Sequence, residues 1–345
     1  MSDAFEFAPT ASLDTLRHRA ALLSFTRRFF DQHGYLEVET PLLSPDVVVD
    51  AHLEPFSTRF LPDPTSQSGP ELFLQTSPEF SLKRLLACGS GPVFEVFRAF
   101  RNGERGRLHN PEFTLIEWYR PGDSYLEQMN FTEEYVRDFF NEAAALRCGE
   151  TRIIAKPFER LSYDDAFQLY AGQRVLRSTV EELAKLARDR DVPIPPYLLV
   201  AESSRDAWLN LLLAEVVEPH LGVERPTFLY DYPASQAALA RVRGDDPPVA
   251  ERFELYIDGI ELCNGYHELL DAKELRRRNC EQNRKRAELG LRTLPEDSRL
   301  LAAMEHGLPA CSGVALGFDR LVMIALGKDT IGGVRAFLTE ERATR

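Results

Sequence analysis

The sequence predicts an α+β fold in which helices flank a mainly antiparallel sheet of about six or more strands. Two segments, Val93–Phe100 and Phe113–Tyr119, are rich in branched and aromatic residues and are joined by a polar loop, as in a strand pair. Two further alternating segments meet at Asp258-Gly259, the strongest short-range signal for a β-hairpin. Apolar residues at helical spacing elsewhere predict the helices that cover this sheet.

The first predicted helix begins near Leu13. Its apolar residues recur at helical spacing as far as Phe30, and His33-Gly34 supplies the end of the helix. A strand over residues 35–40 is expected next, and Pro41 ends it.

A proline-, serine- and glycine-rich stretch, residues 63–70, predicts a loop. The helix after it is expected to have Ser77 as its cap, Pro78 at its first position and Glu79 in its first turn. Helices are expected again over residues 127–146, 163–170, 180–189 and 206–217. These helices predict a helical insertion at about 124–222, after which strand character resumes at Thr227–Tyr230.

The loop between the first two predicted strands carries Arg101, Arg105, Arg107 and His109. Hairpin loops usually have about two to five residues, so a longer loop with this charge predicts a binding function. Arginine suits phosphate and carboxylate oxygens because its guanidinium presents several donors in a fixed plane. The alternative is a solvated surface loop.

The hairpin at Asp258-Gly259 predicts a pair of carboxylates. With a two-residue turn, Tyr256 pairs with Glu261 and Glu254 pairs with Cys263, which makes the two glutamates diagonal neighbours about 7–8 Å apart. Such oxygen ligands suit Mg²⁺, which commonly takes one or two carboxylates together with substrate phosphates. Two exposed glutamates on a solvent face are the alternative.

A third segment, residues 311–323, reads as a small-residue strand that passes through Gly317 into a helix near Asp319. Glycine allows a flat ligand to lie against the backbone, and Arg320 in the first helical turn faces the same place. Together with the arginine-rich loop and the paired glutamates, this segment predicts a nucleotide site.

The formal net charge of −13 argues against broad nucleic-acid binding, which depends on phosphate neutralisation. A local basic cluster at residues 276–278 and 284–286 is either a solvated helix face or a docking face for an acidic protein. No apolar run reaches membrane-spanning length and residues 1–10 lack a targeting pattern, so a cytoplasmic protein is expected. Five scattered cysteines predict neither a disulfide framework nor a zinc site.

These segments resemble motifs 2 and 3 of class II aminoacyl-tRNA synthetases, and residues 34–41 resemble motif 1. Residues 109–113, 117–119 and 264–265 are similar to the lysyl-tRNA synthetase catalytic domain. The chain resembles even more closely a family of truncated lysyl-tRNA synthetase paralogues that modify elongation factor P. The residues that carry this resemblance are 110–121, 233–237, 265–269 and 311–317. The resemblance covers roughly Leu13 to Leu338.

The resemblance implies one class II catalytic domain over residues 1–345, without an anticodon-binding domain and without tRNA binding. It implies a homodimer that uses ATP and Mg²⁺ to activate (R)-β-lysine as an adenylate and transfers it to a lysine side chain of elongation factor P. One alternative is another class II adenylate-forming enzyme that uses α-lysine or a different amino acid. The other is a non-catalytic, synthetase-like regulatory module.

The resemblance also assigns roles to residues. Arg101, at the α-phosphate and the substrate carboxylate, and Arg320, at the γ-phosphate, are expected to be catalytic, while Glu254 and Glu261 are expected to hold Mg²⁺. The expected nucleotide-binding residues are Arg101, Asn102, Gly103, Glu104, His109, Asn110, Phe113, Glu254, Leu255, Gly317 and Arg320. The expected substrate-binding residues are Ser77, Glu79, Glu117, Tyr119, Glu261, Asn264, Glu268 and Ala315.

Three positions bear on specificity. Lysyl-tRNA synthetases have glycine where this chain has Cys263 and Ala315, and the paralogue family typically has alanine at both. The added volume is expected to reshape the floor of the amine pocket, although Cys263 as inert packing is the alternative. Gly103 stands where the families have an adenine-binding glutamate, so we hypothesise that Glu104 moves into that role.

Overall fold

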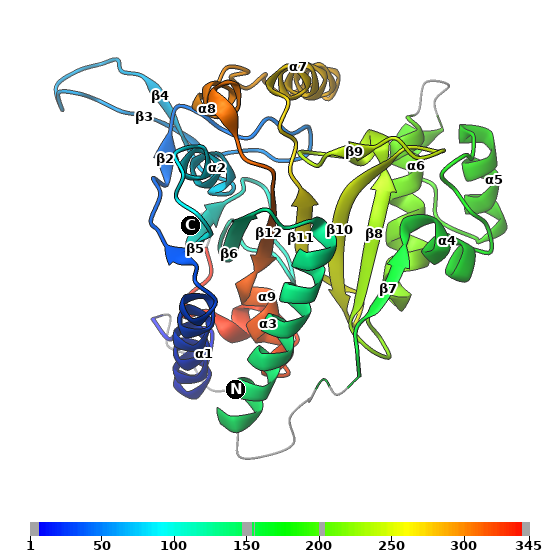
Figure 1. Cartoon of the computed structure of the whole chain (residues 1–345), viewed down its shortest axis with the longest axis horizontal. Helices are drawn as coiled ribbons and strands as arrows, with labels where there is room; N and C mark the ends of the chain where they lie inside the picture. The colour runs from blue at the N-terminus through cyan, green and yellow to red at the C-terminus, as the bar shows by residue number, and fades with distance from the viewer. Residues whose placement is uncertain (1–6, 147–153, 155, 200–203, 340–345) are drawn as a thin grey trace.

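The computed structural model describes residues 7–146, 154, 156–199 and 204–339 (Figure 1). Its main sheet has nine strands in the order β1-β5-β6-β12-β11-β10-β8-β7, with β9 paired to β10. Pairing is antiparallel from β5 through to β8, whereas the edge strands β1 and β7 run parallel to their neighbours. The predicted α+β fold with a mainly antiparallel sheet is confirmed.

The strands of the main sheet are β1 (Leu36–Glu37), β5 (Val93–Phe100), β6 (Glu112–Pro121), β7 (Glu159–Ser162), β8 (Thr227–Pro233), β9 (Val242–Arg243), β10 (Val249–Ile257), β11 (Ile260–His267) and β12 (Cys311–Gly317). A second sheet contains β2 (Leu43–Ser44), β3 (Ser57–Arg59) and β4 (Glu71–Leu74). The expected strand over residues 35–40 is therefore reduced to two residues.

The α-helices are α1 (Leu13–Gln32), α2 (Glu79–Ala87), α3 (Tyr125–Leu146), α4 (Tyr163–Ala171), α5 (Val180–Asp189), α6 (Arg205–Leu212), α7 (Ala272–Glu288), α8 (Arg299–Gly307) and α9 (Phe318–Ala325). A π-helical turn, Leu213–Val217, extends α6. In the described part of the chain, no helix combines the length and apolar content that a bilayer crossing needs.

Side-chain caps explain several helix starts. Ser12 accepts a hydrogen bond from the Thr15 N–H at the start of α1, and Thr179 forms a capping box with Glu182 at the start of α5. Pro78 was predicted at the first helical position, with Ser77 as the cap. Helix α2 instead begins at Glu79, and Pro78 is the residue just before it. The Ser77 hydroxyl nevertheless accepts from the Glu79 N–H at 3.0 Å.

Three groups of helices cover the sheet (Figure 1). Residues of α1, α3 and α9 pack on β5, β6, β10, β11 and β12 in the largest core cluster. Helices α4, α5 and α6 pack on β8 and β10, and α2, α7 and α8 form a third cluster at one end of the sheet. The expected helical insertion also contains strand β7, which pairs with β8 and extends the sheet.

Two adjacent rows of paired residues cross four central strands. In the first row Glu117 pairs with Ala315, Ala315 with Asn264, and Asn264 with Glu254. Residues paired directly across strands share one face of a sheet, so these four side chains lie on the same side.

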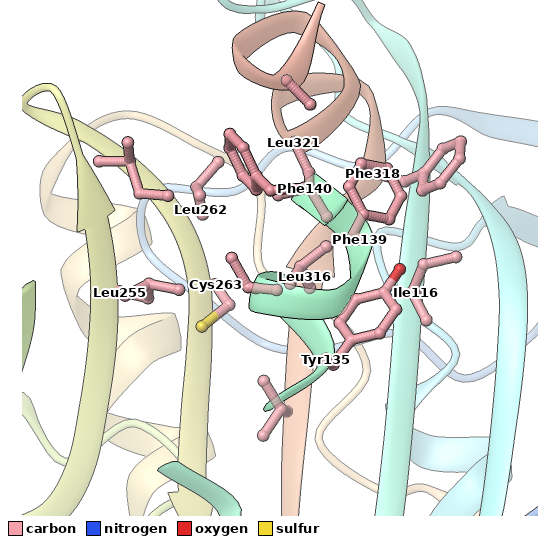
Figure 2. Close-up of a cluster of buried hydrophobic side chains, with 14 of the residues drawn as sticks. Ile116, Tyr135, Phe139, Phe140, Leu255, Leu262, Cys263, Leu316, Phe318 and Leu321 are labelled. Carbon is pink, nitrogen blue, oxygen red and sulfur yellow. The ribbon is translucent and has the colours of Figure 1, made fainter. Parts of the chain in front are cut away.

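The neighbouring row contains Ile116, Leu316, Cys263 and Leu255 and faces the opposite side. All four are buried in the main core, where Figure 2 shows them beside residues of α3. The sheet therefore separates a polar face, which carries the expected site, from the largest hydrophobic core.

The hairpin at Asp258-Gly259 forms as predicted, with positive φ at both turn residues, but its register differs. Tyr256 pairs with Glu261 as expected, whereas Leu255 pairs with Cys263 and Glu254 pairs with Asn264. The predicted pairing of Glu254 with Cys263 is wrong because Leu262 is an extra residue in a bulge of β11. This bulge turns Cys263 into the core while Glu254 and Glu261 both stay beside the polar cavity.

Candidate active site

A cavity of about 1190 Å³ lies over the polar row, and most of the predicted site residues line it. Arg101, Arg320, Glu254 and Glu261 are all part of this lining, although they come from four separate segments of the chain. Three described residues expected at the nucleotide, Asn102, Gly103 and Leu255, lie outside the lining. The cavity therefore brings together the four charged groups on which the predicted nucleotide site depends.

Arg320 is held at one end of the cavity by polar contacts. Its Nη1 donates to the backbone oxygen of Glu261 at 2.7 Å, and its Nη2 lies 2.7 Å from His109 Nε2. Burial and the charge of Arg320 lower the pKa of His109, so the neutral ring accepts this hydrogen bond. These contacts fix the direction of the Arg320 guanidinium.

Arg101 also lines the cavity, and its charge, like that of Arg320, acts on the Glu261 carboxyl. Its guanidinium carbon is 4.9 Å from the ring centroid of Phe113, and its Nη1 is 3.6 Å from Glu104 Oε1. Phe113 therefore supports Arg101 through a cation–π contact and packs only partly against the core. Glu104 lines the cavity, which is the placement that its hypothesised role in adenine binding requires.

Glu254 is held by a dense set of donors. Its carboxylate accepts from Tyr232 at 2.5 Å, Tyr256 at 2.6 Å, Arg252 at 2.5 Å and Asn264 at 3.1 Å. None of Tyr232, Tyr256 and Arg252 was singled out as a site residue from the sequence, because their partners are distant in the chain or two residues away on the same strand. These contacts fix the orientation of the Glu254 carboxylate beside the cavity.

Glu261 lies at the rim, where its side chain is 42% exposed. Although the side chain is partly exposed, the protein atoms packed around its carboxyl and the nearby charge of Glu254 raise the pKa of Glu261. Among the described residues, no three His, Cys, Asp or Glu side chains form a cation site by themselves. Two close carboxylates of this kind fit Mg²⁺ only if other oxygens complete its coordination, as nucleotide phosphates do.

At the end of the polar row opposite to Glu254, Glu117 is buried among hydroxyl donors. Ser77 donates to its Oε2 at 2.8 Å and Tyr119 donates to its Oε1 at 2.8 Å. Burial and the charge of Glu79 raise the pKa of Glu117 to about 8. Such a carboxyl is ready to receive a cationic ligand that offsets the cost of its ionisation.

A lysine that was not expected at the site, Lys83, lies between two of the predicted glutamates. Its Nζ is 2.5 Å from Glu79 Oε1 and forms an ion pair with Glu268 Oε2, and its side chain is 3% exposed. Burial opposes the charge of Lys83, but Glu268 and Glu79 outweigh it and raise the Lys83 pKa. We call Glu79, Glu117 and Glu268 the carboxylate cage.

Glu268 is fully buried, and its Oε1 has no hydrogen-bond partner within the described chain. Burial raises the pKa of Glu268 to about 8, although Lys83 acts against the shift. Gly313 makes room for this carboxylate, because a Cβ there would lie 2.9 Å from Glu268 Oε1 and 2.2 Å from the Tyr119 ring. The cage thus keeps one buried acceptor free.

Several expected roles do not match where the side chains lie. Leu255 and Cys263 are in the core and outside the cavity lining, which favours the alternative that Cys263 is inert packing. The Asn110 amide donates to the Glu112 backbone oxygen at 2.6 Å and also contacts Thr339. Asn110 lines the cavity as expected, and it also joins Thr339 to the loop between β5 and β6.

Gly103 has a φ of +83°, and no described atom would come within 4 Å of a Cβ placed there. The space that a family glutamate would fill at this position is therefore open. Ala315, in contrast, lines the cavity as expected, between Glu117 and Asn264 in the polar row.

The helical insertion contributes to the cavity, which the sequence did not indicate. Asp206, Asn210, Leu213 and Glu218 line it, and the π-helical turn lies between Leu212 and Glu218. The Glu218 carboxyl lies 3.1 Å from the Tyr256 hydroxyl, which is closer to Glu254 at 2.6 Å. The insertion therefore closes the cavity on the side of β8 and β10.

The basic cluster on α7 is extensively ion-paired. Arg277 pairs with Glu274 and Glu281, and Arg278 pairs with Glu274. Arg286 is fully buried, where it forms an ion pair with Glu54. These pairs favour the interpretation of α7 as a solvated, salt-bridged helix.

Comparison with known proteins extends these observations to the whole chain. The family model described as tRNA synthetases class II (D, K and N) matches residues 6–341. The elongation factor P–(R)-β-lysine ligase of Klebsiella pneumoniae strain 342 is 48% identical over 343 residues, covering 99% of this chain and 100% of that protein. The protein of the same name from Salmonella arizonae is 47% identical with the same coverage. The matched region includes every strand and helix that lines the cavity.

Proposed function

The chain belongs to the class II tRNA synthetases of the D, K and N group, and on this premise we propose that it is an ATP-dependent elongation factor P–(R)-β-lysine ligase. It activates (R)-β-lysine as an aminoacyl adenylate and transfers the β-lysyl group to a lysine side chain of elongation factor P. The observation that carries the proposal is one cavity whose lining combines two arginines, the paired glutamates Glu254 and Glu261, and the carboxylate cage. The names of the full-length relatives support the choice of amino acid and acceptor.

In the first step an oxygen of the β-lysine carboxylate attacks the α-phosphorus of ATP, and the bond to the β-phosphate oxygen breaks to release pyrophosphate. A carboxylate is already ionised, so no general base is required. Alignment and neutralisation of phosphate charge are required instead. Arg101 serves the α-phosphate and the substrate carboxylate, and Arg320, which His109 and the Glu261 backbone hold in place, serves the γ-phosphate.

We assign a Mg²⁺ ion to Glu254 and Glu261, with nucleotide phosphates as further ligands. When bound, this ion neutralises negative charge on the phosphates and helps pyrophosphate to leave. Glu254 keeps its orientation through Tyr232, Tyr256 and Arg252. Glu261 shares the rim of the cavity with Arg320, whose Nη1 is 3.9 Å from Glu261 Oε2.

The carboxylate cage binds the amines of the substrate. Three carboxylates face one internal ammonium, Lys83, so two negative charges remain for the ligand to balance. A lysine isomer carries two ammonium groups and matches this requirement. The hydroxyls of Ser77 and Tyr119 orient Glu117 toward these ammonium groups.

In the second step a neutral lysine amine of elongation factor P attacks the acyl carbon of the adenylate. An amide bond forms, the bond to the phosphate oxygen breaks, AMP leaves and the amine loses a proton. The acceptor amine must reach the cavity, because the acyl carbon lies between the carboxylate cage and Arg101 in this arrangement.

ATP–pyrophosphate exchange tests the first step. The proposal predicts exchange that depends on (R)-β-lysine and is clearly slower with α-lysine. Equal or faster exchange with α-lysine would favour a different class II adenylate-forming enzyme. No exchange with either isomer, in protein that binds ATP, would favour a regulatory module.

A further inference from the structure

Lys83 is a buried cation that the proposed reaction does not use. It lies on α2, four residues after Glu79, and its Nζ contacts both Glu79 and Glu268. The Tyr119 ring lies 5.7 Å away. Among the described residues, Lys83 is the one cation that forms an ion pair with a glutamate of the cage, and it pairs with Glu79 and Glu268.

The charges of the cage do not balance without a ligand. When all three carboxyls are ionised, as pairing with ammonium groups requires, three carboxylates against one ammonium carry a net charge of −2, and Glu117 and Glu268 are 1% and 0% exposed. Buried charges are costly unless they are paired. The free acceptor on Glu268 and the raised pKa of Glu117 and of Glu268 are both signs of this imbalance.

We infer that Lys83 is a specificity-determining residue, whose ammonium cancels one of the three carboxylates so that the cage is balanced by a substrate with two ammonium groups. The inference rests on the proposed function, because it assumes that the amines of the amino acid occupy this end of the cavity. A substrate with one ammonium leaves a buried carboxylate unpaired.

If charge balance determines binding, the affinities of two Lys83 variants for (R)-β-lysine should follow a different order from the one expected if packing determines it. Lys83→Met removes the internal ammonium and leaves a cage of charge −3, so a bound lysine isomer is one charge short. The double variant Lys83→Met/Glu79→Gln removes both partners of one ion pair. The net charge of the cage is then −2 again, because Glu117 and Glu268 are the remaining carboxylates. If only packing mattered, the second substitution would make binding worse.

The experiment measures the affinity of full-length protein for (R)-β-lysine by calorimetry, together with ATP–pyrophosphate exchange. Lys83→Met is expected to weaken binding about a hundredfold, because it leaves a buried charge uncompensated. The double variant is expected to bind at least about tenfold more tightly than Lys83→Met. Equal or weaker binding by the double variant would overturn the inference.

Lys185→Met is the matched control. Lys185 pairs with Asp189 at the same four-residue helical spacing, but both side chains are exposed, at 70% and 55%. Its affinity for (R)-β-lysine is expected to stay within about twofold of the wild type, because exposed pairs contribute little. A loss as large as that of Lys83→Met would mean that a general effect of the substitution explains the result.

Glu79→Gln provides a second arm that does not require Lys83→Met to fold. This variant keeps Lys83 and changes the net charge of the cage from −2 to −1. One ammonium group balances that charge, as in the analogue 6-aminohexanoic acid. The ratio of affinities for (R)-β-lysine and this analogue is expected to fall at least about tenfold. An unchanged ratio would contradict the inference while leaving the function intact, whereas wild-type protein that neither binds nor activates a lysine isomer would refute the proposed function itself.

Discussion

The guanidinium of Arg320 donates a 2.7 Å hydrogen bond to the backbone oxygen of Glu261. This contact joins the first turn of α9 to the start of β11, so a cation for the phosphates and a carboxylate for a metal ion are positioned together. The neighbouring Asp319 is anchored by Arg19 at 2.5 Å and by Arg335 at 2.7 Å. Buried ion pairs therefore hold the helix that presents Arg320.

Arg320→Ala is expected to lower the rate of adenylate formation by about 10²–10³-fold, as loss of one charge-stabilising donor does. Affinity for (R)-β-lysine should remain, because the side-chain contacts of Arg320 in the described chain are with Leu108, His109 and Glu261 and not with the carboxylate cage. Exchange kinetics and calorimetry separate the two effects. Arg17→Ala is the control, since Arg17 is exposed and paired only with Asp14 nearby in α1, and an equal loss of lysine affinity in Arg320→Ala would contradict the assignment.

Affinity for (R)-β-lysine is expected to rise with pH from about 6 to 8. Glu117 and Glu268 have pKa values raised to about 8, and the ammonium groups need them ionised. The stability of the ligand-free protein changes in the opposite direction. A carboxyl whose folded pKa exceeds its unfolded value of 4.5 destabilises the fold as pH rises from 4.5 to about 8.

Calorimetric titration and thermal unfolding at about pH 6, 7 and 8 measure both trends. In Glu117→Gln each trend should be smaller, because one of the two titrating groups is gone. An affinity that does not change with pH would mean that these carboxyls are already ionised in the free protein.

Ala315 is expected to affect the choice between lysine isomers, whereas Cys263 is expected to affect only the stability of the fold. Ala315→Gly should increase the use of α-lysine relative to (R)-β-lysine by about tenfold, because one methyl group in a pocket is worth about 1–3 kcal/mol. Cys263→Ala should leave this ratio unchanged and lower the free energy of unfolding by about 1 kcal/mol, because Cys263 packs in the core. Exchange assays with both isomers and denaturant unfolding distinguish these outcomes, and a change of isomer preference in Cys263→Ala would place it at the site.

Glu104→Ala is expected to raise the KM for ATP about tenfold, which corresponds to the loss of one hydrogen bond to a charged group. It should also reduce discrimination against GTP. Glu104 lines the cavity beside Arg101, whereas the neighbouring Gly103 offers no side chain. Glu112→Ala serves as a control from the same hairpin, because Glu112 lies outside the cavity lining, and an unchanged ATP affinity in Glu104→Ala would remove this residue from adenine binding.

The sequence predicted the parts of the site whose signals are local. The turn residues Asp258 and Gly259 predicted the hairpin, and the ends of the predicted strands placed Arg101 just after β5 and Arg320 in the first turn of the helix after β12. The bulge at Leu262 left no such signal, because an extra apolar residue in an apolar strand does not change its composition. One residue of register therefore decided whether Cys263 faces the cavity or the core.

Lys83 was missed for a different reason. On α2 alone it resembles an ordinary helix charge that pairs with Glu79 four residues earlier. Its burial depends on Glu268, which follows β11 and is far away in the sequence. Strand β7 was missed because Glu159–Ser162 is short and rich in polar residues, so only its pairing with β8 identifies it.

The most direct measurement is the intact mass of purified elongation factor P after incubation with this protein, ATP, Mg²⁺ and each lysine isomer. The account predicts that elongation factor P gains one lysyl group with (R)-β-lysine, that gain with α-lysine is far slower, and that Arg320→Ala abolishes both. No change in mass with (R)-β-lysine, under conditions where the protein forms the adenylate, would contradict the account.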